Sequence, residues 1–106
     1  MIRAEFFVRD HRFCGFSVSG HAGAAPAGSD IVCAAVSSAV YLTANAVTEV
    51  LGLAPELQVH DDGFLSLSVS LRDQAACEPF LKALWLHLGQ LSQQYPKNLK
   101  VFQTEE

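Results

Sequence analysis

An uncharged, largely apolar stretch from Ile31 to Val47 constrains the fold more than any other feature of this sequence. Its length approaches the roughly 18 apolar residues of a membrane span. Many alanines and four polar residues interrupt it: Ser37, Ser38, Thr43 and Asn45. We therefore interpret it as a buried helix, capped by Ser29 or Asp30 and ending near Leu51, where Gly52 suits the C′ position. Because it is apolar nearly all round, this helix is expected to lie in the middle of the structure.

Two pairs of strands flank this helix, as alternating apolar and polar residues indicate. Residues 2–9 alternate, Asp10-His11 is a tight turn, and a second strand follows with three inward residues: Cys14, Phe16 and Val18. After the helix, Leu57 and Val59 mark a third strand, and Asp61-Asp62-Gly63 predicts a turn. Residues 65–71 are the clearest strand, because apolar residues there alternate with serines.

A second helix and a closing strand complete the pattern. The inward side of this helix is predicted from six residues at helical spacing: Cys77, Phe80, Leu84, Leu88, Leu91 and Tyr95. Pro79 is expected to lie near its start or to kink it, Tyr95-Pro96 ends it, and Leu99 with Val101 suits a short strand. Residues 1–106 are thus predicted to form a single α+β domain of order ββαββαβ, with two helices against a mixed, mostly antiparallel sheet.

Charge and cysteine content exclude several classes of function. The formal net charge is -4 at pH 7, and the 7 Lys and Arg residues form no cluster, so no direct nucleic-acid partner is expected. Three cysteines without a CxxC pair argue against a disulfide framework and indicate a reducing, cytoplasmic location. Charged residues near the N-terminus predict that there is no signal peptide, and no membrane partner is expected.

Cys33 is the candidate nucleophile. With Asp30 as the N-cap, Cys33 would lie in the first helical turn, where free N–H groups and the helix dipole favour a thiolate and an oxyanion. His21 comes directly off the second strand, so that strand end and the helix start could bring base and nucleophile together. The alternatives are a small core cysteine and a histidine that hydrogen-bonds its own loop.

A loop rich in small residues, from Gly20 to Ser29, joins His21 to the helix. Gly23 and Gly28 permit unusual backbone angles, so the segment could close over a bound chain as a lid, or could simply connect two elements.

Two further polar residues have open roles in this region. Asp30 could cap the helix or orient the His21 ring, while Ser37, one turn beyond Cys33, could hydrogen-bond near the site or permit close packing. Cys14 and Cys77 are interpreted as core residues. The remaining histidines show no spacing typical of a metal site, so neither a metal nor a cofactor is expected.

The order of residues resembles that of a known family. Gly20-His21-Ala22, then Gly28, and then residues 30–35 (DIVCAA) with Ser37 look like the signature of the bacterial ribosomal-processing cysteine proteases. The Tyr95-Pro96 stop, the Leu99-Lys100-Val101 strand and the total length also resemble that family. The likeness therefore spans nearly the whole chain.

The resemblance implies a small α+β homodimer that removes the N-terminal extension of a bacterial large-subunit ribosomal protein, cutting after a Phe-Phe pair. It implies that His21 is the base and Cys33 the nucleophile, with Asp30 and Ser37 as supporting residues. One difference concerns residues 23–27, which read GAAPA where family members commonly carry polar or charged residues.

Two other hypotheses remain beside the endopeptidase. One is a non-catalytic binding module or chaperone for a basic ribosomal protein, which the negative net charge would suit. The other is a small core domain whose conspicuous loop has no role. Cleavage, binding without cleavage, and thiol reactivity distinguish the three.

Overall fold

A computed structural model describes residues 1–20 and 27–106, and for residues 27–30 it describes the backbone alone. The elements, in chain order, are β1 Ile2–Arg9, β2 Arg12–Ser19, α1 Ala27–Asn45, the π-helical turn η1 Ala46–Val50, β3 Glu56–Val59, β4 Leu65–Ser68, α2 Gln74–Gln94 and β5 Leu99–Glu105. The predicted order ββαββαβ is confirmed.

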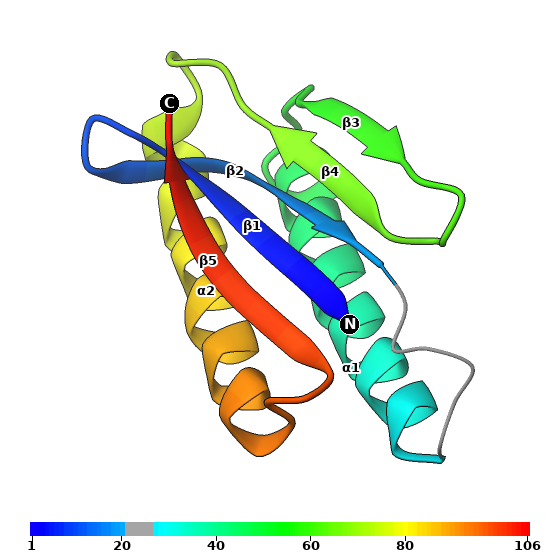
Figure 1. Ribbon diagram of the computed structural model, residues 1–106. Coiled ribbons are helices and arrows are strands. Elements are labelled where there is room, and N and C mark those ends of the chain that lie inside the picture. Colours follow the sequence, from blue (N-terminus) through cyan, green and yellow to red (C-terminus); the bar gives the residue numbers. More distant parts are fainter. Residues whose placement is uncertain (21–26) are drawn as a thin grey trace.

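The five strands form one mixed sheet in the order β3-β4-β2-β1-β5. β1 pairs in parallel with β5, whereas the other neighbours are antiparallel. Both helices lie against the same face of this sheet (Figure 1). The predicted α+β architecture of two helices on a mostly antiparallel sheet is therefore confirmed.

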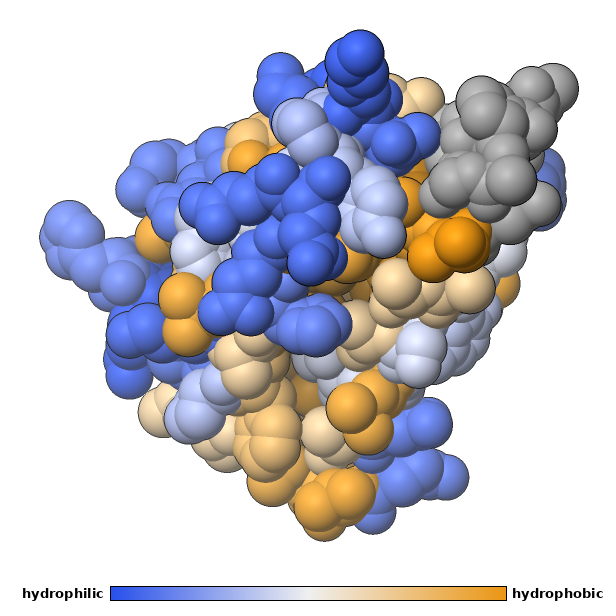
Figure 2. All heavy atoms as spheres, turned by 90° about the horizontal axis from the view of Figure 1, so that it is seen from below, coloured by the Kyte–Doolittle hydropathy of each residue, from blue (hydrophilic) through white to orange (hydrophobic). Residues whose placement is uncertain are grey.

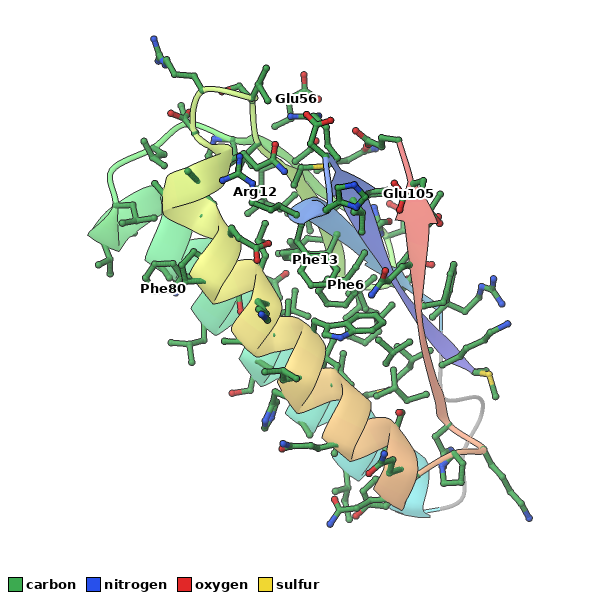
Figure 3. All side chains as sticks on the ribbon, turned by 90° about the vertical axis from the view of Figure 1, so that its left-hand side faces the viewer. Phe6, Arg12, Phe13, Glu56, Phe80 and Glu105 are labelled. Carbon is green, nitrogen blue, oxygen red and sulfur yellow. The ribbon has the colours of Figure 1, made fainter. Side chains whose placement is uncertain are left out.

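The helix-facing side of the sheet carries the residues that the alternation predicted. In β1 and β2 these buried side chains are Ile2, Ala4, Phe6, Val8, Cys14, Phe16 and Val18; Phe13 of β2 is buried as well, and β4 adds Leu65 and Leu67. Aromatic rings extend this core towards α2, since Phe6 packs edge-to-face on Trp85 at 5.3 Å between ring centroids. Figure 3 shows Phe6 and Phe13 in the space between sheet and helix.

Helix α1 does not lie in the middle of the structure, and that expectation is wrong. Over residues 31–50 the buried side chains form a single row that continues from α1 into η1: Val32, Val36, Val40, Thr43, Ala44 and Val47. Residues Ile31–Val50 have the length and hydropathy of a membrane-spanning helix, with a mean hydropathy of 1.6. In this fold the valine row instead completes the core of a two-layer domain, and apolar side chains on the opposite side stay exposed.

Two smaller expectations are corrected by the structure, one on α2 and one on β4. Phe80 is 36% exposed and points away from the sheet (Figure 3), while Leu81 takes the buried position. Both Phe80 and Leu81 satisfy helical spacing with Cys77 and Leu84, so only contact with the sheet decides between them. Strand β4 ends at Ser68 rather than continuing to Leu71, because the chain turns there into α2 and leaves Leu71 exposed.

The β1–β2 hairpin depends on α2 for its conformation. Asp10 and His11 both have positive φ, at 55° and 65°, which is unfavourable for residues other than glycine. The buried side chain of Gln74 donates through Nε2 to the carbonyls of Arg9 and Arg12 at 2.9 and 3.1 Å, one on each side of the turn. His11 is exposed there, as predicted for a turn residue.

We expect Leu88→Ala to lower the free energy of unfolding by about 2–5 kcal/mol, because it opens a cavity at a fully buried position. Leu86→Ala is the matched control on the same helix; this side chain is 55% exposed, and its loss should change stability by less than about 0.5 kcal/mol. Urea denaturation followed by circular dichroism measures both. Equal effects would contradict the assignment of the buried face of α2.

Candidate active site

A pocket of about 280 Å³ lies where the end of β2, the first half of α1 and the β3–β4 turn meet. Its described lining consists of Gly20, Cys33, Ala34, Ser37, Asp62, Gly63 and Phe64. The structure thus brings together three residues that the sequence singled out, Gly20, Cys33 and Ser37. Cys33 is partly exposed, whereas Cys14 and Cys77 are buried, as predicted for core residues.

Helix α1 presents Cys33 and Ser37 on one face, one turn apart. Val32 and Val36, which precede them in the chain, are fully buried, so their burial sets the rotation of the helix. That rotation leaves the Cys33 thiol beside the core and also accessible from the pocket. Cys33 and Ser37 therefore lie one helical turn apart and line the same pocket, as their spacing in the sequence predicted.

The start of α1 differs from the expectation. The helix begins at Ala27, so Gly28 and Ser29 are helical rather than part of a loop, and Asp30 is not its N-cap. An acidic residue is also stabilising inside the first turn of a helix, near the positive end of the helix dipole, so Asp30 is compatible with a helix that begins three residues earlier. Cys33 is then beyond the first turn, and its own N–H is not among the free groups that could bind an oxyanion.

His21, Ala22 and Gly23 lie outside the described residues, as do the side chains of Ser29 and Asp30. The described residue next to His21 is Gly20, which has a φ of +100°. A Cβ at this position would come within 2.5 Å of the carbonyl oxygen of Met1. Only glycine fits here, so the chain leaves β2 in a conformation that is closely defined.

Asp62 is a polar residue of the pocket. From the sequence it was predicted only to be part of a turn, and no role in the site was expected. Its Oδ2 accepts a hydrogen bond from the Gly20 N–H at 2.8 Å, and its Oδ1 accepts one from the Phe64 N–H at 2.9 Å. No local pattern indicates the first of these bonds, because it depends on β4 pairing with β2. The Asp-Asp-Gly turn between β3 and β4 was the one sequence signal that a carboxylate could lie near the end of β2.

The β3–β4 turn is also tied to α1 and to the sheet. The Tyr41 hydroxyl donates to the Gly63 carbonyl at 2.7 Å. The His60 ring lies 3.1 Å through Nδ1 from the Val18 carbonyl and 2.8 Å through Nε2 from the Ser66 hydroxyl. Because a carbonyl can only accept, Nδ1 carries a proton, and His60 acts here as a bridge between strands.

A thiol at the edge of an open, partly polar pocket is suited to nucleophilic attack on a bound carbonyl. Among the residues that the structure describes, no group of three or more His, Cys, Asp and Glu side chains could hold a metal ion. The described pocket combines the Cys33 thiol with the hydroxyl of Ser37 and the carboxylate of Asp62.

We expect iodoacetamide to modify Cys33 well before Cys14 and Cys77 at neutral pH. Burial raises the pKa of both Cys14 and Cys77 above the ordinary value, which lowers their thiolate fraction, and both are also inaccessible. Peptide mapping by mass spectrometry, with labelling time varied, measures the three rates. Similar rates at all three cysteines would contradict this assignment.

Comparison with known proteins identifies the family. The family described as "Cysteine protease Prp" matches residues 1–100. The "Ribosomal processing cysteine protease Prp" of Bacillus subtilis is 30% identical over 97 residues, which cover 87% of each chain. A crystal structure of a Streptococcus mutans protein superimposes with a TM-score of 0.87 at 26% identity, covering 100% of this chain and 96% of that one.

The fold also matches that of a relative with a bound peptide. The structure of the ribosomal processing protease Prp from S. aureus in complex with a substrate peptide superimposes with a TM-score of 0.86 at 21% identity. It covers 98% of this chain and 100% of its own. Because the family matches residues 1–100 and the B. subtilis relative is 30% identical over 87% of the chain, this protein belongs to the ribosomal-processing cysteine proteases of the Prp family.

Proposed function

We propose that this cysteine protease removes the N-terminal extension of a bacterial large-subunit ribosomal protein in the cytoplasm, cutting after a Phe-Phe pair. Cys33 is the nucleophile and His21 the base. The observation that carries the proposal is the partly exposed Cys33 thiol in a pocket whose wall includes Gly20, the residue before His21. The S. aureus relative has been crystallised with a substrate peptide and with a covalently linked product peptide, which supports a peptide substrate.

The proposed reaction proceeds through a thioester. His21 takes the proton of the Cys33 thiol, and Sγ attacks the scissile carbonyl carbon to form a tetrahedral intermediate. The C–N bond breaks as His21 passes that proton to the leaving amine. A water molecule, deprotonated by His21, then attacks the thioester carbon, which releases the carboxylate product and restores the thiol. Since Cys33 lies beyond the first turn of α1, its activation rests on His21 rather than on the helix dipole.

Supporting roles are proposed for Ser37 and Asp30. The pocket places Ser37 one turn beyond Cys33, where its hydroxyl can hydrogen-bond a peptide bound across the thiol. Asp30 lies in α1 rather than at its N-cap. Because it is three residues before the nucleophile on the same helix, we assign it to the orientation of the site.

The substrate is proposed to bind in an extended conformation. Adjacent Phe side chains on an extended chain point to opposite faces, so one faces the enzyme while the other is directed outwards. Phe64 supplies an apolar surface in the pocket for one of them. The net charge of -4 favours association with a basic ribosomal protein.

We expect Cys33→Ala and His21→Ala each to abolish cleavage of a peptide that carries a Phe-Phe pair at the end of its extension. Cys77→Ala is the control, because that thiol is buried and does not line the pocket, so its loss should leave the rate per folded molecule unchanged. Mass spectrometry of the products measures the rate and the position of the cut. Normal cleavage by Cys33→Ala would refute the nucleophile assignment.

A second peptide, with Ala-Ala in place of Phe-Phe, tests the substrate preference. Cleavage of both peptides at equal rates would contradict the Phe-Phe specificity while leaving the peptidase assignment in place. If the wild-type chain binds the ribosomal protein but leaves its mass unchanged, the binding-module hypothesis replaces the endopeptidase.

The active form is proposed to be a homodimer in which the outer faces of α1 and α2 meet those of a second copy. A groove of about 590 Å³ runs between the two helices, lined in part by Ala35, Ala39 and Ala83. Small residues there allow another helix to approach closely. Beside it Leu42 is 72% exposed, and apolar atoms gather on the helix side of the molecule (Figure 2). One self-complementary face is what a two-fold dimer requires.

We expect Leu42→Glu to convert the dimer into a monomer, because it would place a charge in an apolar interface. Leu57→Glu is the control, since Leu57 is an exposed leucine on strand β3, away from the two helices. Sedimentation equilibrium gives the mass of each species. A monomeric wild-type chain, or a dimer that survives Leu42→Glu unchanged, would contradict this interface.

A further inference from the structure

The carboxylate of Asp62 joins two parts of the chain that are far apart in sequence. One oxygen accepts the Gly20 N–H at the end of β2, and the other accepts the Phe64 N–H within its own turn. Hydrogen bonds from backbone N–H groups to an ionised carboxylate are stronger than those between neutral groups. Asp62 is half-buried, which limits competition from water.

The turn that carries Asp62 is held from several sides. The His60 N–H donates to the Phe64 carbonyl at 2.7 Å, and the Gly63 N–H donates to the His60 carbonyl at 3.0 Å. The His60 ring bridges to Val18 on β2, and Tyr41 on α1 reaches Gly63. The turn that carries the Asp62 carboxylate is therefore fixed both to the sheet and to α1, the helix that carries Cys33.

Asp62, its partner Gly20 and the candidate nucleophile Cys33 all line the same pocket. Cys33 lines it from α1, and Gly20 lines it from the end of β2, immediately before His21 in the chain. The Gly20 backbone is confined by the nearby Met1 carbonyl, and the hydrogen bond from its N–H to Asp62 holds this residue in the wall of the pocket. Misplacing a catalytic group by about 1 Å can lower a rate about 100-fold.

We propose that Asp62 is a positioning residue of the cysteine site: by binding the Gly20 N–H, its carboxylate holds Gly20, the residue that precedes the proposed base His21 in the chain, in the wall of the pocket that Cys33 lines. This inference rests on the proposed pair of Cys33 and His21. It assigns a task to a residue that is otherwise only part of a hairpin turn. A purely structural Asp62 would stabilise the turn without influencing the reactivity of the thiol.

The test compares Asp62→Asn with Asp61→Asn, a matched control because Asp61 is the exposed neighbour in the same turn. Asparagine keeps the shape but has one acceptor oxygen, so it cannot accept from both N–H groups as the carboxylate does. We expect Asp62→Asn to lower kcat for the Phe-Phe peptide about 10- to 100-fold with KM nearly unchanged. Asp61→Asn should match the wild type.

The deciding measurement is the rate at which iodoacetamide alkylates Cys33 at neutral pH, resolved from the other cysteines by peptide mapping. Asp62→Asn should slow it about 10-fold, whereas in a His21→Ala background the same substitution should have no further effect. A thermal melt of each variant confirms that the compared molecules are folded. Such non-additivity is what positioning through His21 requires.

Three outcomes would overturn the proposal. They are an alkylation rate in Asp62→Asn that equals or exceeds that of Asp61→Asn, an equal slowing with and without His21, and a fall in kcat with no change in alkylation. The alkylation measurements do not depend on cleavage. If the wild-type chain cuts no peptide, the proposed function fails, while the slower, His21-dependent alkylation in Asp62→Asn still supports positioning by Asp62.

Discussion

The row of valines on α1 is the packing constraint on which the rest of this structure depends. Val32, Val36, Val40 and Val47 are fully buried and join the core formed with the helix-facing side of the sheet. Burying each such side chain contributes on the order of 1.5–3 kcal/mol, so a rotation of α1 that exposed the row would be strongly disfavoured. Cys33 and Ser37 follow two of these valines directly and are turned towards the pocket as a result.

The sheet supplies the other half of the site. β4 pairs with β2, so the turn before β4 reaches the end of β2, where Gly20 and Asp62 form their hydrogen bond. The His60 ring and the Tyr41 hydroxyl connect that same turn to β2 and to α1. The pocket is therefore assembled from three segments that are distant in sequence, and each is fixed by hydrogen bonds or burial that do not involve the thiol itself.

Local patterns predicted well wherever the periodicity of the chain was unambiguous. Alternation in residues 2–9 identified the buried side of β1, and Ser66 and Ser68, which alternate with Leu65 and Leu67, marked the outward side of β4. The prediction failed where two positions satisfied the same period, as with Phe80 and Leu81 on α2. It also failed at the start of α1, where Ser29 and Asp30 suggested a cap although the helix continues back to Ala27.

By itself, the sequence determined the order of the elements, the apolar side of each main strand and the residues of the family signature, because these depend on neighbours within a few positions along the chain. The tertiary structure decided which face of α1 is buried, that Phe80 is directed outwards, and that Asp62 meets Gly20 beside Cys33. Those outcomes depend on which strands pair and on how the helices rest on the sheet, and such contacts between distant segments have no periodic signal in the sequence.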